Sequence, residues 1–70
     1  MFIVYVLKSA IAVKSYVGFT ENLGRRLGEH NAGKHFYTRR HKPWLVVHAE
    51  EFRTFSEARN RERFLKTSSG

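Results

Sequence analysis

The chain contains no cysteine among its 70 residues, and it has no long hydrophobic run. Without cysteine it can form neither a disulfide framework nor a thiolate zinc site, so nothing of that kind can reinforce its core. The first apolar stretch, residues 2 to 7, is far too short to span a bilayer and has no basic segment before it. We therefore expect a single soluble, cytoplasmic domain. A chain of this length buries only about 60% of its unfolded surface, which makes the core marginal.

Acidic residues are also scarce. Six of them face thirteen lysines and arginines, which gives a formal net charge of +7. No acid occurs between residues 30 and 49, where several lysines and arginines gather. This imbalance favours a polyanionic partner, although a basic surface can also serve solubility alone.

The hydrophobic pattern predicts the order strand, strand, helix, strand, helix. Residues 2 to 8 are almost continuously β-branched or aromatic, as in a strand that is covered on both faces. Two further strands are expected over residues 15 to 19 and 44 to 52, which makes a three-stranded antiparallel sheet flanked by helices, an α+β fold. Thr20 or Asn22 can cap the first helix and Gly33 can end it, while a capping box at residues 54 to 57 opens a second helix that ends near Lys66.

Two tyrosines lie on the first two expected strands. A hairpin loop centred near residues 11 and 12 places Tyr5 opposite Gly18, on the same face as Tyr16. The two phenols would then be diagonal neighbours, about 7 Å apart. A slip of one residue would put them on opposite faces of the sheet.

Polar residues interrupt the apolar face of the first helix. Leu23 and Leu27 form its stripe, and Arg26 and His30 border it. A charged side chain beside a core face is costly unless it is paired or faces a cleft. Alternatively, Arg26 extends to solvent along its aliphatic stem and His30 only ends the helix, where a cation is favourable.

The second helix has a similar interruption. Its inward positions 55, 58, 62 and 65 are apolar except for Glu62. This carboxylate could form an ion pair with Lys66 or Arg59, or it could bind a divalent cation in a cleft. The three histidines other than His30 lack the spacing of a zinc site.

A basic loop is expected over residues 34 to 43. It interleaves cations with Phe36 and Tyr37, whose rings could stack on unpaired bases or pack on the core. Cations in such a loop contact the phosphate backbone. The candidate nucleic-acid contacts are Lys34, Thr38, Arg39, Arg40 and Lys42.

The two tyrosine segments and the helix after them resemble the GIY-YIG nuclease family. This sequence has VYV at residues 4 to 6 and YVG at residues 16 to 18, followed by Arg26 and His30. The resemblance extends to Lys66 and is strongest to small stand-alone bacterial members. It implies that Tyr5, Tyr16, Arg26 and His30 are catalytic and that Glu62 binds Mg²⁺ or Mn²⁺. The general base stays open between the tyrosines and His30.

The resemblance also implies a function and a domain organisation. Residues 1 to 70 would form one nuclease domain, and relatives usually continue with a further basic, partly apolar segment that this chain would lack. We expect a metal-dependent endonuclease that hydrolyses DNA. So small a domain has little surface for reading a long sequence, which favours branched, damaged or single-stranded substrates of the repair or recombination type. The alternatives are a non-catalytic nucleic-acid-binding module on the same scaffold and a basic domain that contacts RNA or protein.

Overall fold

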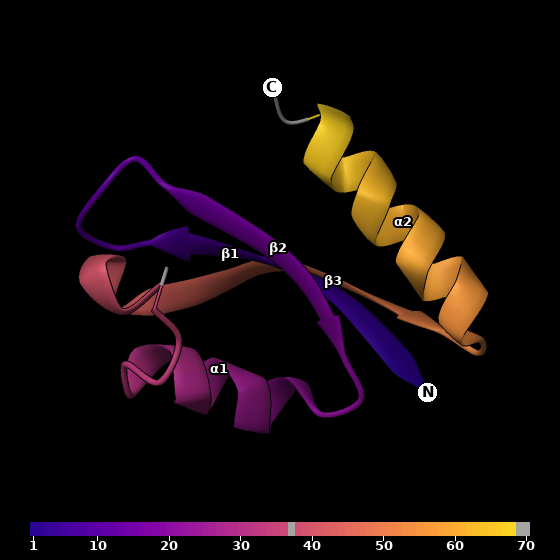
Figure 1. The fold of residues 1–70 in the computed structure, drawn as a ribbon, viewed down its shortest axis with the longest axis horizontal. Coiled ribbons are helices and arrows are strands. Elements are labelled where there is room, and N and C mark those ends of the chain that lie inside the picture. Colours follow the sequence, from indigo (N-terminus) through magenta and orange to yellow (C-terminus); the bar gives the residue numbers. More distant parts are fainter. Residues whose placement is uncertain (37, 69–70) are drawn as a thin grey trace.

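The computed structural model describes residues 1–36 and 38–68, except for the side chain of Ser68. Its elements follow the expected order, with one short 3-10 turn added in the expected loop (Figure 1). The expected α+β fold is confirmed, and each strand begins and ends within one residue of its expected limits. In chain order the elements are β1 (Phe2–Ser9), β2 (Ser15–Thr20), α1 (Leu23–Asn31), the 3-10 turn η1 (Thr38–His41), β3 (Trp44–Phe52) and α2 (Phe55–Ser68).

The sheet has the strand order β2-β1-β3, and both pairings are antiparallel. The central position of β1 explains its nearly continuous apolar sequence, since it is covered on both faces. Tyr5 lies opposite Gly18, and Leu7 lies opposite Tyr16. The predicted register is therefore confirmed, and the two tyrosine rings share a face with their centroids 6.3 Å apart.

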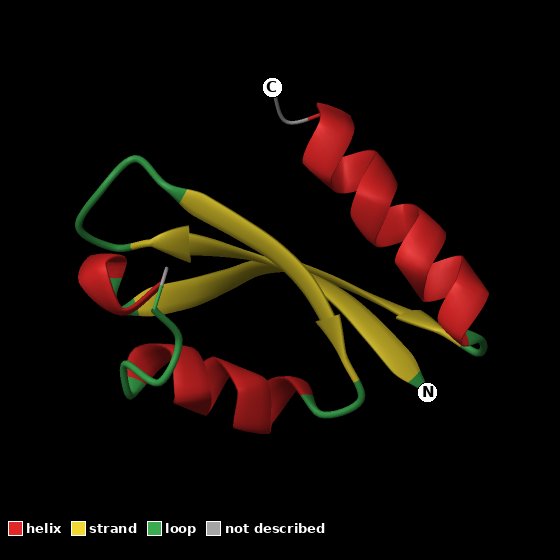
Figure 2. Cartoon of the chain, in the orientation of Figure 1, coloured by secondary structure: helices red, strands yellow, loops and turns green. Residues whose placement is uncertain are grey.

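The two helices cover opposite faces of the sheet (Figure 2). On one face, Tyr5, Leu7 and Trp44 form the buried core cluster. Leu23 and Leu27 of α1 pack against that cluster, as their spacing in the sequence predicts. This face therefore places α1 directly beside the tyrosines.

On the other face, α2 packs mainly against β1 and β2. The Phe55 ring meets Phe2 and Phe19 edge to face, with centroid distances of 5.9 and 5.3 Å. Ala58 and Val4 are both fully buried between the helix and the sheet. These contacts fix which side of α2 turns inward.

Polar caps define where the helices begin. The Asn22 side chain accepts a hydrogen bond from the Arg25 backbone N–H, so Asn22 rather than Thr20 is the cap of α1. The Thr54 hydroxyl accepts a hydrogen bond from the Glu57 backbone N–H, as the expected capping box requires, and it donates one to the Glu57 carboxylate. No helix within the described ranges has the length and apolar character needed to cross a membrane.

Gly33 turns the chain out of α1. Its φ of +82° is a left-handed conformation, which costs glycine little because it has no side chain. The next N–H, of Lys34, donates back to the Glu29 carbonyl and closes the helix end. The chain then returns over the sheet through η1, which brings Thr38 under α1.

Candidate active site

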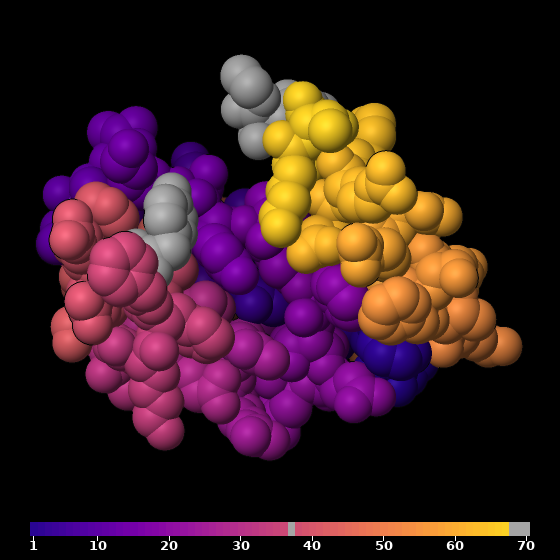
Figure 3. Space-filling model, in the orientation of Figure 1, coloured from indigo at the N-terminus to yellow at the C-terminus, as the bar shows by residue number. Residues whose placement is uncertain are grey.

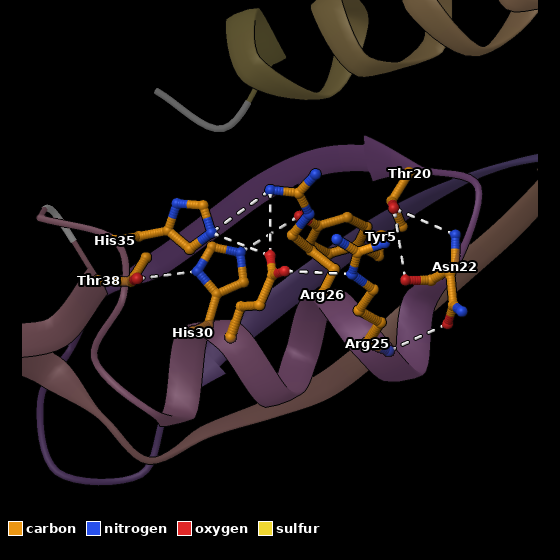
Figure 4. A network of polar contacts seen from close by, with 9 residues as sticks. Tyr5, Thr20, Asn22, Arg25, Arg26, His30, His35 and Thr38 are labelled. Atoms are coloured by element: carbon orange, nitrogen blue, oxygen red, sulfur yellow. Dashed lines mark hydrogen bonds and ion pairs between the residues drawn. The ribbon is translucent and has the colours of Figure 1, made fainter.

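A buried chain of polar side chains links β1, α1 and η1 (Figure 4). The Tyr5 hydroxyl lies 3.3 Å from His30 Nε2, and His30 Nδ1 lies 2.8 Å from the Thr38 hydroxyl. His30 is only 1% exposed and Thr38 is completely buried. With its proton on Nδ1, the imidazole donates to Thr38 and accepts the Tyr5 proton at Nε2. The three groups thus form one continuous hydrogen-bonded path.

Gly18 makes room for this arrangement. A β-carbon at that position would lie 2.7 Å from the Tyr5 hydroxyl oxygen and 3.1 Å from Tyr16 Cε2. Tyr5 could not keep its place beside a larger residue, because real β-carbons essentially never come within 3.0 Å of such atoms, and Tyr16 would have to move by a few tenths of an ångström. The Tyr16 ring also lies 4.9 Å from the His30 ring, centroid to centroid. The glycine of the second tyrosine segment is therefore a packing requirement of the site.

The structure corrects the prediction for Thr38. The sequence placed it among the DNA contacts of an exposed loop, but its side chain is fully buried and bonds to His30. Its carbonyl also accepts the indole N–H of Trp44 at 2.8 Å. Thr38 is therefore a residue that positions His30, and its side chain does not reach the surface.

Arg26 contacts two residues that the sequence pattern did not identify as part of the site, Glu29 and His35. Its guanidinium lies 3.5 Å from the Glu29 carboxylate and 3.4 Å from His35 Nε2. His35 in turn lies 3.5 Å from Glu29, and its ring lies 4.4 Å from the ring of His30. Glu29 also pairs with Arg25 at 3.3 Å. The spacing of Glu29 from the two arginines could have revealed its role, whereas no pattern marked His35 because it follows the helix in a loop.

These surroundings shift the pKa values of the buried groups. Burial raises the pKa of Tyr5, the nearby Tyr16 and Glu62 raise it further, and Arg26 opposes them. Burial lowers the pKa of His30 below its ordinary value, and His35 and Arg26 add to that effect. Burial alone would raise the pKa of Glu29, but His35, Arg26 and Arg25 together lower it. Tyr5 therefore favours its protonated phenol, and His30 favours its neutral imidazole.

Glu62 lies apart from this network, on the helix that covers the opposite face. Its side chain is 13% exposed and lies 3.4 Å from the Lys66 ammonium, the first of the two ion pairs considered from the sequence. Its link to the tyrosines is electrostatic, through the contribution of its charge to the raised pKa of Tyr5. The sequence correctly singled out a carboxylate that is largely withdrawn from solvent.

The basic residues expected to contact DNA remain at the surface, apart from Thr38. The guanidinium carbons of Arg39 and Arg40 lie 4.8 and 5.6 Å from the centre of the Phe36 ring, which is 69% exposed. Lys34 and Lys42 are exposed as well, and Tyr37 lies outside the described residues. Figure 3 shows a hollow between this loop, in pink, and the yellow end of α2.

The donor set fits a hard divalent cation better than zinc. Within residues 1–36 and 38–68, no three His, Cys, Asp or Glu side chains form a group that could hold a metal. Glu62 would thus be a single protein ligand. Mg²⁺ tolerates this because waters and substrate phosphates commonly complete its coordination.

Comparison with known proteins identifies a family and several relatives. The model of the GIY-YIG catalytic domain matches residues 1–70. A UPF0213 protein of Staphylococcus haemolyticus is 44% identical over 55 residues, which cover 77% of this chain and 67% of the relative. One from Natronomonas pharaonis is 43% identical over 67 residues, covering 94% and 78%. One from Listeria welshimeri is 44% identical over 55 residues, covering 77% and 61%. No solved structure matches the chain significantly.

Proposed function

Because this chain belongs to the GIY-YIG nuclease family, we propose that it is a metal-dependent endonuclease that hydrolyses DNA phosphodiester bonds in the cytoplasm. The observation that carries the proposal is the gathering of Tyr5, Tyr16, Arg26 and His30 on one face of the sheet around Gly18. These groups supply the cation that binds the phosphate and the proton acceptor that the hydrolysis of a phosphodiester requires.

Arg26 is the residue assigned to the scissile phosphate. Its side chain is 38% exposed, so a substrate can reach it, while Glu29 and His35 hold it from behind. A guanidinium offers several donors in a fixed plane and remains charged at any physiological pH. It can therefore stabilise the negative charge that develops on the phosphate oxygens during attack.

The buried chain of Tyr5 and His30 is assigned to proton transfer. Tyr5 and His30 are both almost fully buried, and the Tyr5 hydroxyl lies 3.3 Å from His30 Nε2. In the proposed relay, the proton of an attacking water passes to His30 through this hydroxyl. Tyr5 takes that proton and passes its own to His30, which avoids a free phenolate that the raised pKa disfavours. The hydroxide attacks phosphorus, and the bond to the leaving oxygen breaks. Tyr16, which is partly exposed, borders the space where the water would stand.

Glu62 is assigned to a bound Mg²⁺ or Mn²⁺ ion. When bound, such an ion would polarise the phosphate and stabilise the leaving 3′ oxygen. A carboxylate already largely withdrawn from water and close enough to influence Tyr5 is a suitable ligand for it. If the cation replaced Lys66 as the partner of Glu62, the negative charge of the carboxylate would still be balanced.

The basic loop is assigned to the DNA backbone. Lys34, Arg39, Arg40 and Lys42 are exposed and have no acidic residue near them in the sequence. Contacts of this kind carry affinity without sequence information. We propose that the enzyme selects DNA by structure, as in repair or recombination, because so small a domain offers little surface for base readout.

The test is a cleavage assay on linear, flapped and junction DNA with Mg²⁺ or Mn²⁺. Tyr5→Phe removes one hydroxyl and keeps the ring, and it should slow cleavage by about 10² to 10⁴-fold, which is the range of general acid–base catalysis. Phe64→Leu, an exposed position on α2, is the matched control and should cleave normally. If the wild type cleaves none of these substrates yet binds them in a salt-dependent way, the protein is a binding module instead.

A further inference from the structure

A second hollow opens beside the candidate active site. It has a volume of about 450 Å³ and lies where the start of β1, the end of β2 and the first turns of α1 meet. Figure 1 shows these three segments converging near the N-terminus. Pockets of about 300 to 1,000 Å³ hold organic ligands the size of a nucleoside. The hollow is thus large enough for one such group.

One wall of this pocket is aromatic. Phe2 and Phe19 line it, and the rings of both contact the Phe55 ring of α2 edge to face. Because the aromatic rings brace one another, the wall is formed before any ligand arrives. Aromatic walls of this kind bind flat rings by stacking.

The other wall is polar and electrically balanced. Arg25 and Arg26 line it together with Glu21 and Glu29, so the two positive charges are matched by two negative ones. A phosphate inside the pocket, between these four charges, would meet the carboxylates as well as the arginines and would gain little. A neutral ring with donors and acceptors on its edge can use both, and Asn22 adds an amide of the kind that pairs with base edges.

Arg26 connects the pocket to the chemistry. It lines this pocket and also belongs to the network around His30, where it was assigned to the scissile phosphate. A nucleotide held at its phosphate by Arg26 would therefore have its neighbouring base beside the pocket. A base paired inside a duplex cannot enter a pocket of this size, because only an unstacked base exposes both its faces and its pairing edge.

We propose that this pocket binds a single unpaired nucleobase of the DNA, next to the phosphate that is cut. The pocket thereby selects substrates with a single-stranded, frayed or extruded nucleotide at that position. This inference rests on the proposed function, since it names the structural feature by which the nuclease recognises its substrate.

The test is an abasic scan. Single-stranded oligonucleotides, each lacking one base at a successive position along the whole strand, are bound to the protein in EDTA and followed by fluorescence anisotropy. Loss of the base at one position should weaken binding on the order of tenfold, and other positions should matter little. Where the wild type cleaves the strand, that position should lie next to the cleaved bond. Equal effects at every position would overturn the proposal.

Two variants tie the effect to the pocket. Phe19→Leu keeps an apolar side chain but removes the stacking ring. In this variant, DNA that lacks the base at that one position should bind almost as tightly as intact DNA. Arg25→Gln is a surface change, since the Arg25 side chain is 77% exposed, and it should reduce the same penalty even if Phe19→Leu folds poorly. Arg63→Gln, an exposed arginine on α2 that does not line the pocket, should keep the full penalty. A full penalty in both pocket variants would contradict the assignment.

Comparing binding with cleavage shows whether the pocket assignment or the nuclease assignment is wrong. Cleavage by the wild type with no position-specific abasic effect would overturn the pocket and leave the nuclease standing. A position-specific effect without cleavage by the wild type would overturn the nuclease and support the pocket. Free deoxynucleoside monophosphates should not compete at concentrations near the dissociation constant of the DNA. Competition there would show that the pocket takes free nucleotides, which would overturn the assignment to a strand-borne base.

Discussion

The two faces of the sheet carry candidate catalytic groups of very different character. Under α1, Tyr5, His30 and Thr38 are buried and bonded to one another, so each is part of the fold as well as of the site. On α2, Glu62 has a lysine partner and only an electrostatic link to Tyr5. Substitutions in the buried network should therefore lower stability and activity together. A substitution of Glu62 should lower activity with little change in stability.

The largest expected effect is that of Glu62→Gln. Removing the carboxylate charge should reduce cleavage by about 10³-fold or more, because the ion would lose the carboxylate ligand proposed for it. The melting temperature should hardly change, since an ion pair between neighbouring helix turns is worth only about 0.3 to 0.5 kcal/mol. Cleavage assays and thermal denaturation of the same preparation test both statements.

Lys66→Gln is the matched control for that change. It breaks the same ion pair from the other side but leaves the carboxylate free for a cation. Cleavage should therefore persist. If both variants lose activity equally, Glu62 serves the helix through its ion pair and is not a metal ligand.

Thr38→Val tests the buried face. Valine fills the same space but leaves His30 Nδ1 without its partner, at a cost of about 2 kcal/mol. In a domain of this size that corresponds to a fall in melting temperature of roughly 10 °C. Cleavage measured well below the transition should also fall, although less than in Glu62→Gln. Thr38→Ser keeps the hydroxyl and should recover most of both losses, and an unchanged Thr38→Val would refute the positioning role.

Arg40→Ala should have a smaller effect, on binding alone. Losing one phosphate contact should weaken DNA affinity severalfold at low salt and reduce the slope of log K against log salt by about one. The rate at saturating DNA should stay the same. Arg59→Ala removes an equal charge from α2, outside the basic loop, and should leave the slope unchanged.

The smallest effect concerns pH. The pKa of His30 is lowered from 6.5 because the neutral imidazole is buried, so the unfolded chain binds a proton more readily than the folded one. Stability should therefore fall as the pH drops below 6.5, and the loss should be complete below the folded-state pKa of His30. The limiting slope is about 1.4 kcal/mol per pH unit. Urea denaturation of the wild type and of His30→Gln checks this, since the variant should lack that slope.

Two carboxylates affect the pH dependence of stability in a separate, more acidic range. The Arg61 hydrogen bond is the main cause of the lowered pKa of Glu50, and the pKa of Glu29 is lowered as well. Both groups stabilise the fold above their ordinary pKa of 4.5, and that contribution is lost as the pH falls through their folded-state values. A slope confined to this acidic range, with none near neutrality, would contradict the prediction for His30.

Much of the fold could be predicted from local patterns. Alternation and β-branching marked the strands, and the Asn22 cap and the capping box marked the helix starts, because these signals act between residues close in the chain. The tyrosine register followed from the length of a single hairpin loop, which is also a local property. The 3-10 turn at Thr38 escaped prediction, since no periodic signal identifies so short an element.

The candidate site divides in the same way. The sequence by itself determined which polar residues interrupt or border the apolar faces of their helices, namely Arg26, His30 and Glu62. It could do so because the hydrophobic periodicity of a helix depends only on the spacing of residues along the chain. Only the tertiary structure decided what those residues meet. It buried Thr38 under His30, brought His35 and Glu29 onto Arg26, and brought the charge of Glu62 on α2 close enough to raise the pKa of Tyr5. Contacts between residues distant in the chain depend on how whole elements pack, and local spacing does not encode them.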